Sequence, residues 1–399
     1  MIRRFSLILT FIFSISVFVD LKGMSLEETA LIILRKSPEY KSETYSFESL
    51  KQVLRTDGNL PDPQINGEYL AAPSKEGDRW ASELSWGLEW PGVYTARNKE
   101  ADKKLEVAKK RLYANRLDKL SEIKILLLNY ILCQQKLVLL EDLTSNTDSI
   151  YRLSIRAEKD GEITTLDLNK IRLEYANIRA SKASLLYETA TIEGELSKIM
   201  GENCKGVLSE MSLKFPEIIL PTKEEMERLS LFASEVEIAN ADIEATKQAK
   251  KVATMEALPS ISVGYKHAYE EGMHFNGALL GISIPIFSSR NKQKIAKAAI
   301  LESEYNAEAA GKFAETTSLQ SLNKLTLLKS QLDEIEPILE NSDHNTILLK
   351  AYKGGVITLI DYLSERNYFT IASNELISLR HSAAVAQIEL NKYLKKIDL

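Results

Sequence analysis

The sequence predicts a mainly α-helical protein, written as two similar halves, whose few β-strands contribute to a membrane β-barrel. Three observations lead to this fold class: a stretch at 93–160 without Gly or Pro, four short runs with alternating apolar residues, and motifs that recur 194 residues apart. The chain has 399 residues, of which 44% are hydrophobic and 27% charged, as in folded proteins. Its net charge is -5, and no Lys/Arg block stands alone, so the sequence gives no indication of a nucleic-acid partner.

Residues 1–23 have the features of a secretory signal peptide. Arg3 and Arg4 precede an apolar run from Phe5 to Val19, and a charged start followed by such a run is typical of exported proteins. The run is shorter than the ~18–20 residues that a transmembrane helix needs. We therefore expect export rather than an uncleaved anchor.

Short motifs divide the chain into two repeats. GEITTLD at 161–167 returns as GVITLID at 355–361, and GLEWP at 87–91 faces GISIP at 281–285 at the same offset. Motifs in the same order and at near-equal spacing indicate an internal duplication. The mature chain is thus divided into a first repeat at 24–200, a connector at 201–224 and a second repeat at 225–399.

Each repeat is expected to contain a very long helix and a returning helix. The predicted helices are 92–160 and 162–200 in the first repeat, and 288–353 and 356–397 in the second. Apolar residues recur in the first of them at three- and four-residue steps, which predicts a continuous helix ~100 Å long. Gly311 and Pro337 predict a bend or break in the second long helix. Cys133 and Cys204 are expected to be unpaired, because their heights along a hairpin that turns at Gly161 differ by roughly 20 Å.

Four strands are predicted, two before each long helix. Their approximate bounds are 63–71 and 80–90 in the first repeat, and 259–269 and 277–286 in the second. The clearest alternation is in the second strand, whose apolar face carries Trp80, Trp86 and Trp90. Aromatic rings at both ends of such a strand are typical of membrane barrels, where they lie at the two interfaces. We expect Tyr265 and Tyr269 of the third strand to lie at the interface as well.

A sheet with one apolar face needs a cover for that face. A small soluble sheet packed on the helices would satisfy this need, but the flanking helices are expected to lie along the axis instead, which leaves lipid. An open sheet edge in hydrocarbon leaves N–H and C=O groups unpaired, so the barrel must close. Several copies must therefore pool their strands. Two copies would give eight strands with a bore filled by side chains, and three copies would give twelve.

The order of strand pair, long helix, Gly-x-x-Thr-x-x-Asp turn and returning helix resembles the TolC family of outer-membrane efflux proteins over essentially the whole mature chain. LPDPQINGEY at 60–69 and LEWPGVYTARNKEA at 88–101 are similar to its heavy-metal-efflux (CzcC-like) branch. The resemblance implies a homotrimer with a twelve-stranded barrel in outer-membrane lipid and an α-helical tunnel in the periplasm. It also implies two partners, a periplasmic adaptor and an inner-membrane pump, in an efflux or type I secretion system for metal cations or drugs.

The resemblance places the two recurring motifs at helix-hairpin tips around the periplasmic entrance of the tunnel. The residues expected there are Gly161, Thr164 and Asp167 of the first tip, and Gly355, Thr358 and Asp361 of the second. The glycines let the chain reverse with positive φ, the threonines cap the returning helices, and the carboxylates favour the positive helix ends. In the family the second-repeat tips narrow the entrance, so three copies of Asp361 would form an acidic ring that controls opening.

No catalytic or cofactor site is predicted. The sequence has no G-x-S-x-G, Walker or G-x-G-x-x-G motif, and no His/Cys cluster with the spacing of a structural metal site. His267 and His274 lie on either side of Glu270 and Glu271. We interpret this segment as an exposed polar loop between two strands rather than a metal site.

Two other classes of protein remain open at this point. The chain could be a secreted coiled-coil scaffold or interaction protein with a small soluble sheet, or a periplasmic adaptor. Adaptors carry one helical hairpin within β-rich domains, whereas this chain has two hairpins and few strands. Detergent dependence separates a duct from a scaffold, because only the scaffold would stay soluble in plain buffer.

Overall fold

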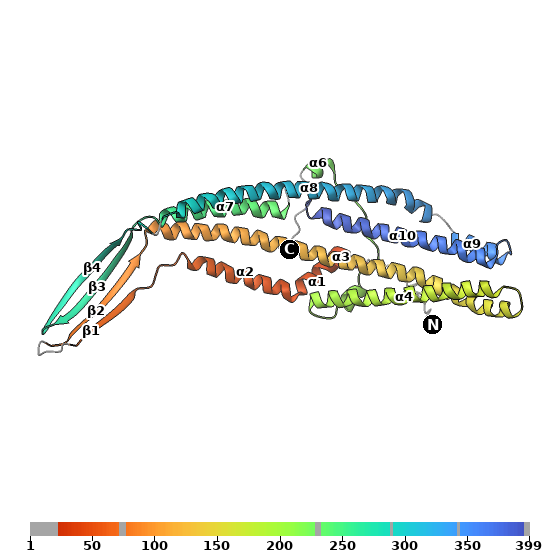
Figure 1. The fold of residues 1–399 in the computed structure, drawn as a ribbon, viewed down its shortest axis with the longest axis horizontal. Coiled ribbons are helices and arrows are strands. Elements are labelled where there is room, and N and C mark those ends of the chain that lie inside the picture. Colours follow the sequence, from red (N-terminus) through yellow and green to blue (C-terminus); the bar gives the residue numbers. More distant parts are fainter. Residues whose placement is uncertain (1–22, 72–76, 228–232, 288–289, 341–343, 395–399) are drawn as a thin grey trace, which may run out of the picture.

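The computed structural model shows a long, narrow molecule with a β-sheet at one end and helices along the rest (Figure 1). It describes residues 23–71, 77–227, 233–287, 290–340 and 344–394. The predicted signal peptide at 1–23 lies outside the described residues, except for Gly23.

The elements follow the same order in both halves of the chain: a helical segment, a strand pair, a long helix and a returning helix. The first half contains α1 (Leu26–Lys36), α2 (Pro38–Thr56), β1 (Gln64–Leu70), β2 (Arg79–Leu88), α3 (Pro91–Lys159) and α4 (Thr165–Met200). Two short helices, α5 (Lys205–Ser209) and α6 (Lys223–Glu227), lie in or at the end of the connector. The second half contains α7 (Ser234–Met255), β3 (Ser260–Glu270), β4 (Met273–Ser283), α8 (Lys292–Glu340), α9 (His344–Lys353) and α10 (Leu359–Asn391).

The four strands form one antiparallel sheet in the order β1-β2-β3-β4. Its central pair, β2 and β3, joins the two halves of the chain, with Trp80 opposite Tyr269 and Leu88 opposite Ile261. The strand pairs of the two repeats thus complete each other within a single chain.

The fourth strand begins earlier than its sequence pattern predicts. A two-residue turn at Glu271 and Gly272, with φ of 51° and 83°, leads directly into β4. Positive φ at both central residues is the geometry that matches the twist of a tight hairpin. The predicted range 277–286 is therefore corrected to Met273–Ser283. Its start was missed because a Glu at positive φ carries no turn signal as strong as Asn or Gly.

The main hydrophobic core lies in the first half, where α3 and α4 form a hairpin with α1 packed against it. The fully buried residues of α3 follow the helical period: Leu120, Ile123, Leu127 and Ile131. Their stretch of Pro91–Glu141 is long and apolar enough to cross a membrane by composition, but its buried side chains are accounted for by this core. Cys133 and Cys204 are both buried in the same core and are free thiols.

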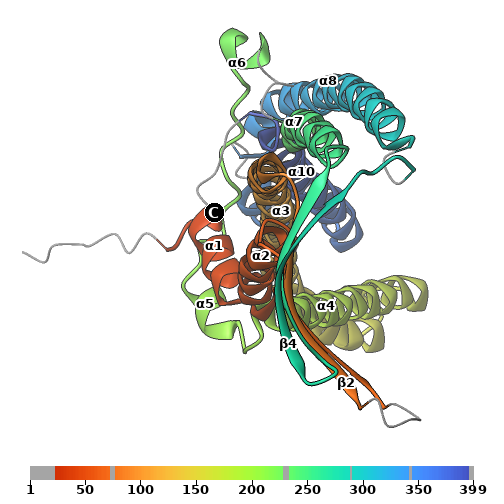
Figure 2. The same cartoon turned by 90° about the vertical axis from the view of Figure 1, so that its left-hand side faces the viewer.

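The second half packs around the same long helix. α7 lies between α3 and α8, and α10 contacts both α8 and α3 (Figures 1 and 2). α8 continues through Gly311 and Pro337 and ends at Glu340. Of the predicted bend or break, a break at Gly311 or Pro337 is therefore wrong, because a helix tolerates an isolated Gly at a cost of ~1 kcal/mol and α8 continues past Pro337.

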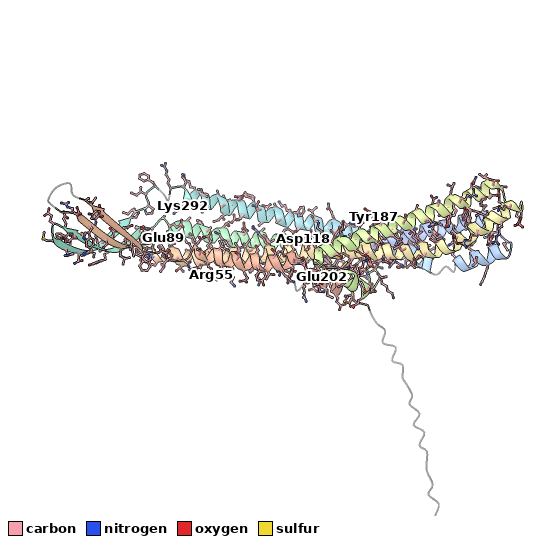
Figure 3. The ribbon with its side chains drawn as sticks, turned by 90° about the horizontal axis from the view of Figure 1, so that it is seen from below. Arg55, Glu89, Asp118, Tyr187, Glu202 and Lys292 are labelled. Carbon is pink, nitrogen blue, oxygen red and sulfur yellow. The ribbon has the colours of Figure 1, made fainter. Side chains whose placement is uncertain are left out.

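Ion pairs connect neighbouring helices along the length of the molecule. Arg55 pairs with Asp102 at 3.1 Å and Lys36 pairs with Glu202 at 2.8 Å. Figure 3 shows Arg55, Asp118 and Glu202 spread along the helical part of the chain. These side chains are about half exposed, and exposed pairs of this kind contribute only ~0–1 kcal/mol each. Burial of apolar residues, rather than surface charge, holds the bundle together.

Candidate functional site

One face of the sheet is apolar across all four strands. Residues paired directly across strands lie on the same face, and residues alternate along each strand. The register therefore places on this face Ile65, Tyr69, Trp80, Leu84, Trp86, Leu88, Ile261, Val263, Tyr265, Tyr269, Leu280 and Ile282. The opposite face carries Asn66, Glu68, Glu83, Ser85, Ser262 and Lys266. The first face also carries Ser82, His267, His274 and Asn276, and the second also carries Met273, Phe275 and Leu279, so the first face is mostly apolar and the second is polar except along β4.

The apolar face has no cover within the single chain. Ile65, Leu280 and Ile282 are 80%, 83% and 74% exposed. The sheet projects beyond the end of the helices (Figure 1). β1 and β4 are its edges, and each has one side without a strand partner in the part of the chain that the structure describes. An exposed apolar face with two open edges needs other molecules to complete it.

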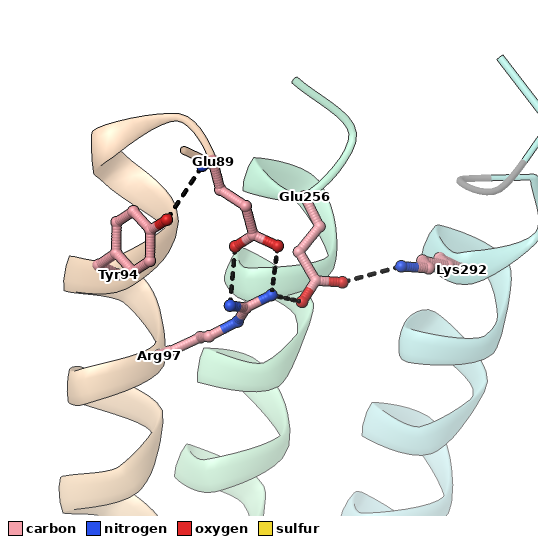
Figure 4. Close-up of polar contacts among 5 residues, drawn as sticks. All are labelled: Glu89, Tyr94, Arg97, Glu256 and Lys292. Carbon is pink, nitrogen blue, oxygen red and sulfur yellow. Dashed lines mark hydrogen bonds and ion pairs between the residues drawn. The ribbon is translucent and has the colours of Figure 1, made fainter. Parts of the chain in front are cut away.

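A charged cluster connects the base of the sheet to three helices (Figure 4). Arg97 Nη1, in α3, lies 2.7 Å from Glu89 Oε2. Arg97 Nη2 lies 2.8 Å from Oε1 of Glu256, the residue that follows α7. Lys292 Nζ, at the start of α8, lies 2.9 Å from Glu256 Oε2. The Glu89 backbone N–H donates to the Tyr94 hydroxyl at 3.0 Å. Burial disfavours the charged form of Glu256, but hydrogen bonds from Arg97 and Lys292 outweigh burial and lower its pKa.

Both hairpin tips end their first helix in the same way. Gly161, after α3, has a φ of 75°, and Gly355, after α9, has a φ of 70°. In each tip the N–H of the next residue donates to the carbonyl five residues back, at 2.8 Å and 2.9 Å. This is a Schellman motif, in which a left-handed Gly lets the chain reverse while the last carbonyls keep their partners.

Both returning helices begin with a capping box. The Asp167 N–H donates to Thr164 Oγ1 at 3.1 Å, and Thr164 N–H donates back to Asp167 Oδ2 at 3.4 Å. The corresponding distances for Asp361 and Thr358 are 3.2 Å and 3.3 Å. The hydrogen bond from the Thr164 side chain lowers the pKa of Asp167. Each carboxylate thus satisfies an N–H group that the helix start leaves free.

The two tips differ in how the aspartate charge is balanced. Asp167 lies 3.7 Å from Lys170 Nζ, one turn along α4. Ser364 occupies the equivalent position in the second repeat, and Asp361 is exposed with no ion pair among the described residues. The second tip therefore presents an unneutralised carboxylate to its surroundings.

Comparison with solved structures finds the same arrangement of sheet and helices in several bacterial membrane proteins. A membrane protein from Pseudomonas aeruginosa aligns over 92% of this chain and 90% of its own, with a TM-score of 0.76 and 15% identity. The CmeC outer membrane channel of Campylobacter jejuni aligns over 92% and 85%, with a TM-score of 0.76 and 16% identity. The open MtrE outer membrane channel of Neisseria gonorrhoeae aligns over 92% and 88%, with a TM-score of 0.73 and 15% identity.

The chain has the fold of an outer-membrane channel protein. The resemblance stated from the sequence is thereby confirmed for the fold, at identities too low to carry more than the fold. Neither protein-family models nor curated protein sequences match the chain.

The predicted aromatic residues of this channel fold lie on or beside the apolar face. Trp80 stacks on Tyr269 with ring centroids 6.1 Å apart, and Tyr265 is 51% exposed. Trp86 donates from Nε1 to the Pro61 carbonyl at 2.6 Å. Trp90 lies beyond the strand as the residue that precedes the first turn of α3. The predicted strand end at 90 is thus corrected to Leu88, because Pro91 suits the first position of a helix rather than a strand.

His267 lies in the predicted third strand, 259–269, whereas the interpretation of His274 as a loop residue is wrong. His267 lies within β3 and His274 within β4, and only Glu271 and Gly272 form the turn between them. Their rings face each other across the two strands. Within the described ranges no group of three or more His, Cys, Asp or Glu residues is arranged to hold a metal ion. The contact was missed because it depends on the cross-strand register, which the early start of β4 sets.

Proposed function

We propose that three copies of this chain form an outer-membrane exit duct, and that the duct passes cargo without any reaction of its own. The single observation that carries the proposal is the four-stranded sheet with one uncovered apolar face and two open edges. Lipid covers the face, and the β1 edge of one copy pairs with the β4 edge of the next. Three sheets then supply twelve strands, and the polar face with Glu83 and Lys266 lines a water-filled bore.

The helices extend the duct on the periplasmic side of the barrel. α3 alone has 69 residues, which corresponds to ~100 Å at the usual helical rise. Three such bundles enclose a tunnel that ends at the hairpin tips. A periplasmic adaptor joins these tips to an inner-membrane pump, which supplies the energy and selects the cargo. The likeness to the CmeC and MtrE channels supports this orientation.

The proposed cargo is a metal cation or a drug, as the resemblance to the efflux family implies. A passive polar wall contacts cargo weakly, so the cargo is chosen by the pump. Co-purification of the pump and the adaptor with this chain from the source cells identifies the cargo class.

The assembly is tested by cross-linking the two edges of neighbouring copies. In a Cys133→Ser, Cys204→Ser background, a cysteine at Asn66 of β1 is combined with a cysteine at one polar-face position of β4, from Phe275 to Gly281. In the correct register the pair forms a disulfide between chains, because the Cα atoms then lie within ~4.4–6.8 Å. We expect cross-linked trimers in outer-membrane fractions. A cysteine at Ser85, on the same face but in the middle of the sheet, combined with the same β4 positions, gives the control without cross-links.

A secreted scaffold would give the opposite result. It would remain soluble without detergent, would run as a single chain, and would form no disulfide between β1 and β4. The exposed apolar face disfavours this alternative, because a soluble sheet of this size would bury that face against its own helices.

The gate of the proposed duct is formed by the second-repeat tips. Three copies of Asp361 around one axis place like charges close together at the entrance, with no lysine at the position of Ser364 to balance them. Cations drawn to this ring offset the mutual repulsion and hold the tips together, and contacts with the adaptor or protonation shift the balance. The first-repeat tips with Gly161, Thr164 and Asp167 form the outer part of the same rim.

A further inference from the structure

Two histidine rings lie next to each other on the mostly apolar side of the sheet. His267 Nε2 lies 3.4 Å from His274 Nδ1, while the ring centroids are 5.4 Å apart. The ring planes are 19° from parallel, and the centroids are farther apart than the two nitrogens, so the rings are offset and the two nitrogens lie on neighbouring ring edges. His267 is paired in register with Asn276, and His274 with Tyr269, so the histidines are diagonal neighbours on adjacent strands.

Asn276 fixes the tautomer of His267. The Tyr265 hydroxyl donates to Asn276 Oδ1 at 2.6 Å, so this oxygen is an acceptor. His267 Nδ1 lies 2.7 Å from the same oxygen and must donate its proton to it. In the neutral ring Nε2 is then unprotonated and accepts a hydrogen bond from His274 Nδ1 at 3.4 Å, so a metal ion bound to both nitrogens displaces the proton on His274 Nδ1. Histidines that bind metals are usually held in this way, with the second ring nitrogen donating to an oxygen.

Aromatic side chains hold the two rings from outside. The Trp80 ring lies 5.1 Å from that of His267, and the Tyr269 ring lies 5.0 Å from that of His274, centroid to centroid. Arg79 lies on the other face of the sheet, where it pairs with Glu270 at 3.0 Å. By the strand register, none of the described residues on this face of β2, β3 and β4 is Lys or Arg. No fixed positive charge beside the pair therefore opposes the binding of a cation.

We propose that His267 and His274 form a two-histidine site for a divalent transition-metal ion such as Cu²⁺ or Zn²⁺. Two nitrogens bound tetrahedrally at ~2.0–2.1 Å from a metal are ~3.4 Å apart, which matches the observed separation of 3.4 Å. Imidazole suits Cu²⁺, Ni²⁺ and Zn²⁺, whereas Mg²⁺ and Ca²⁺ prefer oxygen ligands. The pair lies close to the β3–β4 turn, at the end of the sheet away from the helices, where the proposed lipid cover ends and water completes the coordination. Both ligands belong to one β-hairpin of one chain, so the site does not depend on the proposed duct.

Titration with Cu²⁺ and Zn²⁺ tests the site on the full mature chain, purified in detergent without a polyhistidine tag. Tryptophan fluorescence reports Cu²⁺ binding, because Trp80 lies beside His267. We expect saturable binding of one ion per chain, no competition from Mg²⁺, and a Cu²⁺ paramagnetic resonance spectrum with two nitrogen ligands. His267→Ala and His274→Ala each weaken binding at least tenfold. Asn276→Leu, which removes the tautomer control, weakens it by about 10–100-fold.

Two controls separate this site from metal binding elsewhere on the chain. His381→Gln removes a histidine far along the sequence and leaves binding unchanged, whereas Trp80→Phe reduces the fluorescence response but keeps the stoichiometry. Circular dichroism of each variant verifies that the sheet and helices are intact. The proposal is overturned if the His267→Ala, His274→Ala double variant binds either metal as tightly as the unaltered chain, or if the unaltered chain shows no saturable binding.

Discussion

Arg97 Nη2 lies 2.8 Å from Glu256 Oε1, although the two residues are 159 positions apart in the chain. The contact links the start of the first long helix to the end of α7, where the second half of the chain enters the sheet. Both side chains are only about one-fifth exposed, at 22% and 23%. A partly buried pair with hydrogen bonds to both carboxylates stabilises more than a surface pair does. Arg97 thus helps to set the angle between the sheet and the helices.

Replacement of Arg97 is expected to destabilise the chain. Arg97→Ala leaves Glu89 without its cation and should lower the free energy of unfolding by about 2 kcal/mol, the usual cost of hydrogen bonds to charged groups. Arg97→Lys keeps the positive charge, but a single ammonium group cannot reach both carboxylates. The free energy of unfolding should therefore fall by about 1 kcal/mol. Urea unfolding in detergent micelles, followed by circular dichroism, measures both variants.

Arg55→Ala is the matched control for this prediction. Arg55 lies 3.1 Å from its partner Asp102, but both side chains are more than half exposed. The free energy of unfolding should therefore fall by no more than about 1 kcal/mol in Arg55→Ala. If Arg97→Ala and Arg55→Ala have equal free energies of unfolding, the charged cluster stabilises the junction of sheet and helices no more than an exposed ion pair does.

The turn at Gly355 is expected to require glycine because of its backbone conformation and not because of crowding by neighbouring atoms. Its φ is 70°, and a Cβ added there would meet no atom within 4 Å. Gly355→Ala should therefore cost about 1 kcal/mol through backbone strain. Amide hydrogen exchange at the second tip should become roughly fivefold faster, since this energy shifts the opening equilibrium by that factor.

Gly194, in the C-terminal part of α4, provides the comparison for the turn. A Cβ added at Gly194 would also meet open space, but this residue lies in a regular helix, where Ala is favoured by ~1 kcal/mol. Gly194→Ala should slow exchange in α4. Faster exchange in Gly194→Ala, or unchanged exchange in Gly355→Ala, would contradict the argument.

The stability of the helical part should fall in mild acid because of His381. Its Nε2 lies 2.7 Å from Asn129 Oδ1, so the neutral ring donates a proton there. Burial, with a contribution from Lys136, lowers the pKa of His381 below its ordinary value of 6.5. The unfolded chain therefore binds a proton first as the pH falls, and stability that is complete above pH 6.5 is lost progressively below it.

His381→Gln should remove this dependence, since a Gln amide can still donate to Asn129 but does not titrate. The measurement is the urea midpoint of both proteins between pH 5 and pH 8. A slope of the same size in His381→Gln would assign the acid sensitivity to other groups, such as Glu256, whose lowered pKa produces a loss only below its ordinary value of 4.5.

The features predicted well from the sequence are those set by local chemistry. The length of α3 follows from the absence of Gly and Pro in 93–160, and the chain reversals follow from Gly161 and Gly355, whose positive φ disfavours other residues. The apolar alternation of β2 is equally visible. In each case a few consecutive residues carry the whole signal.

The features that were missed depend on contacts between distant segments. The β4 start follows from a turn with Glu271 at positive φ, which a sequence pattern does not reveal. The His267–His274 pair appears only once the register of β3 and β4 is known. Arg97 and Glu256 meet across 159 residues, and each alone is an ordinary charged residue, one in α3 and the other just after α7. Pairing of this kind is decided by packing rather than by local preference.

Asp361 is expected to control the conductance of the proposed duct, whereas Asp167 is not. Both residues close a capping box of the same geometry, so Asp361→Asn and Asp167→Asn should weaken their helix starts to a similar, small extent. Only Asp361 lacks a neighbouring lysine and lies in the repeat that is proposed to narrow the entrance. In planar bilayers the unaltered trimer should show little open-channel conductance, and Asp361→Asn or Asp361→Ala should raise it several-fold, because the ring then no longer holds the cations that keep the tips together. Equal conductance in both asparagine variants would remove the gate while leaving the duct intact, because cross-linking of β1 to β4 tests the duct separately.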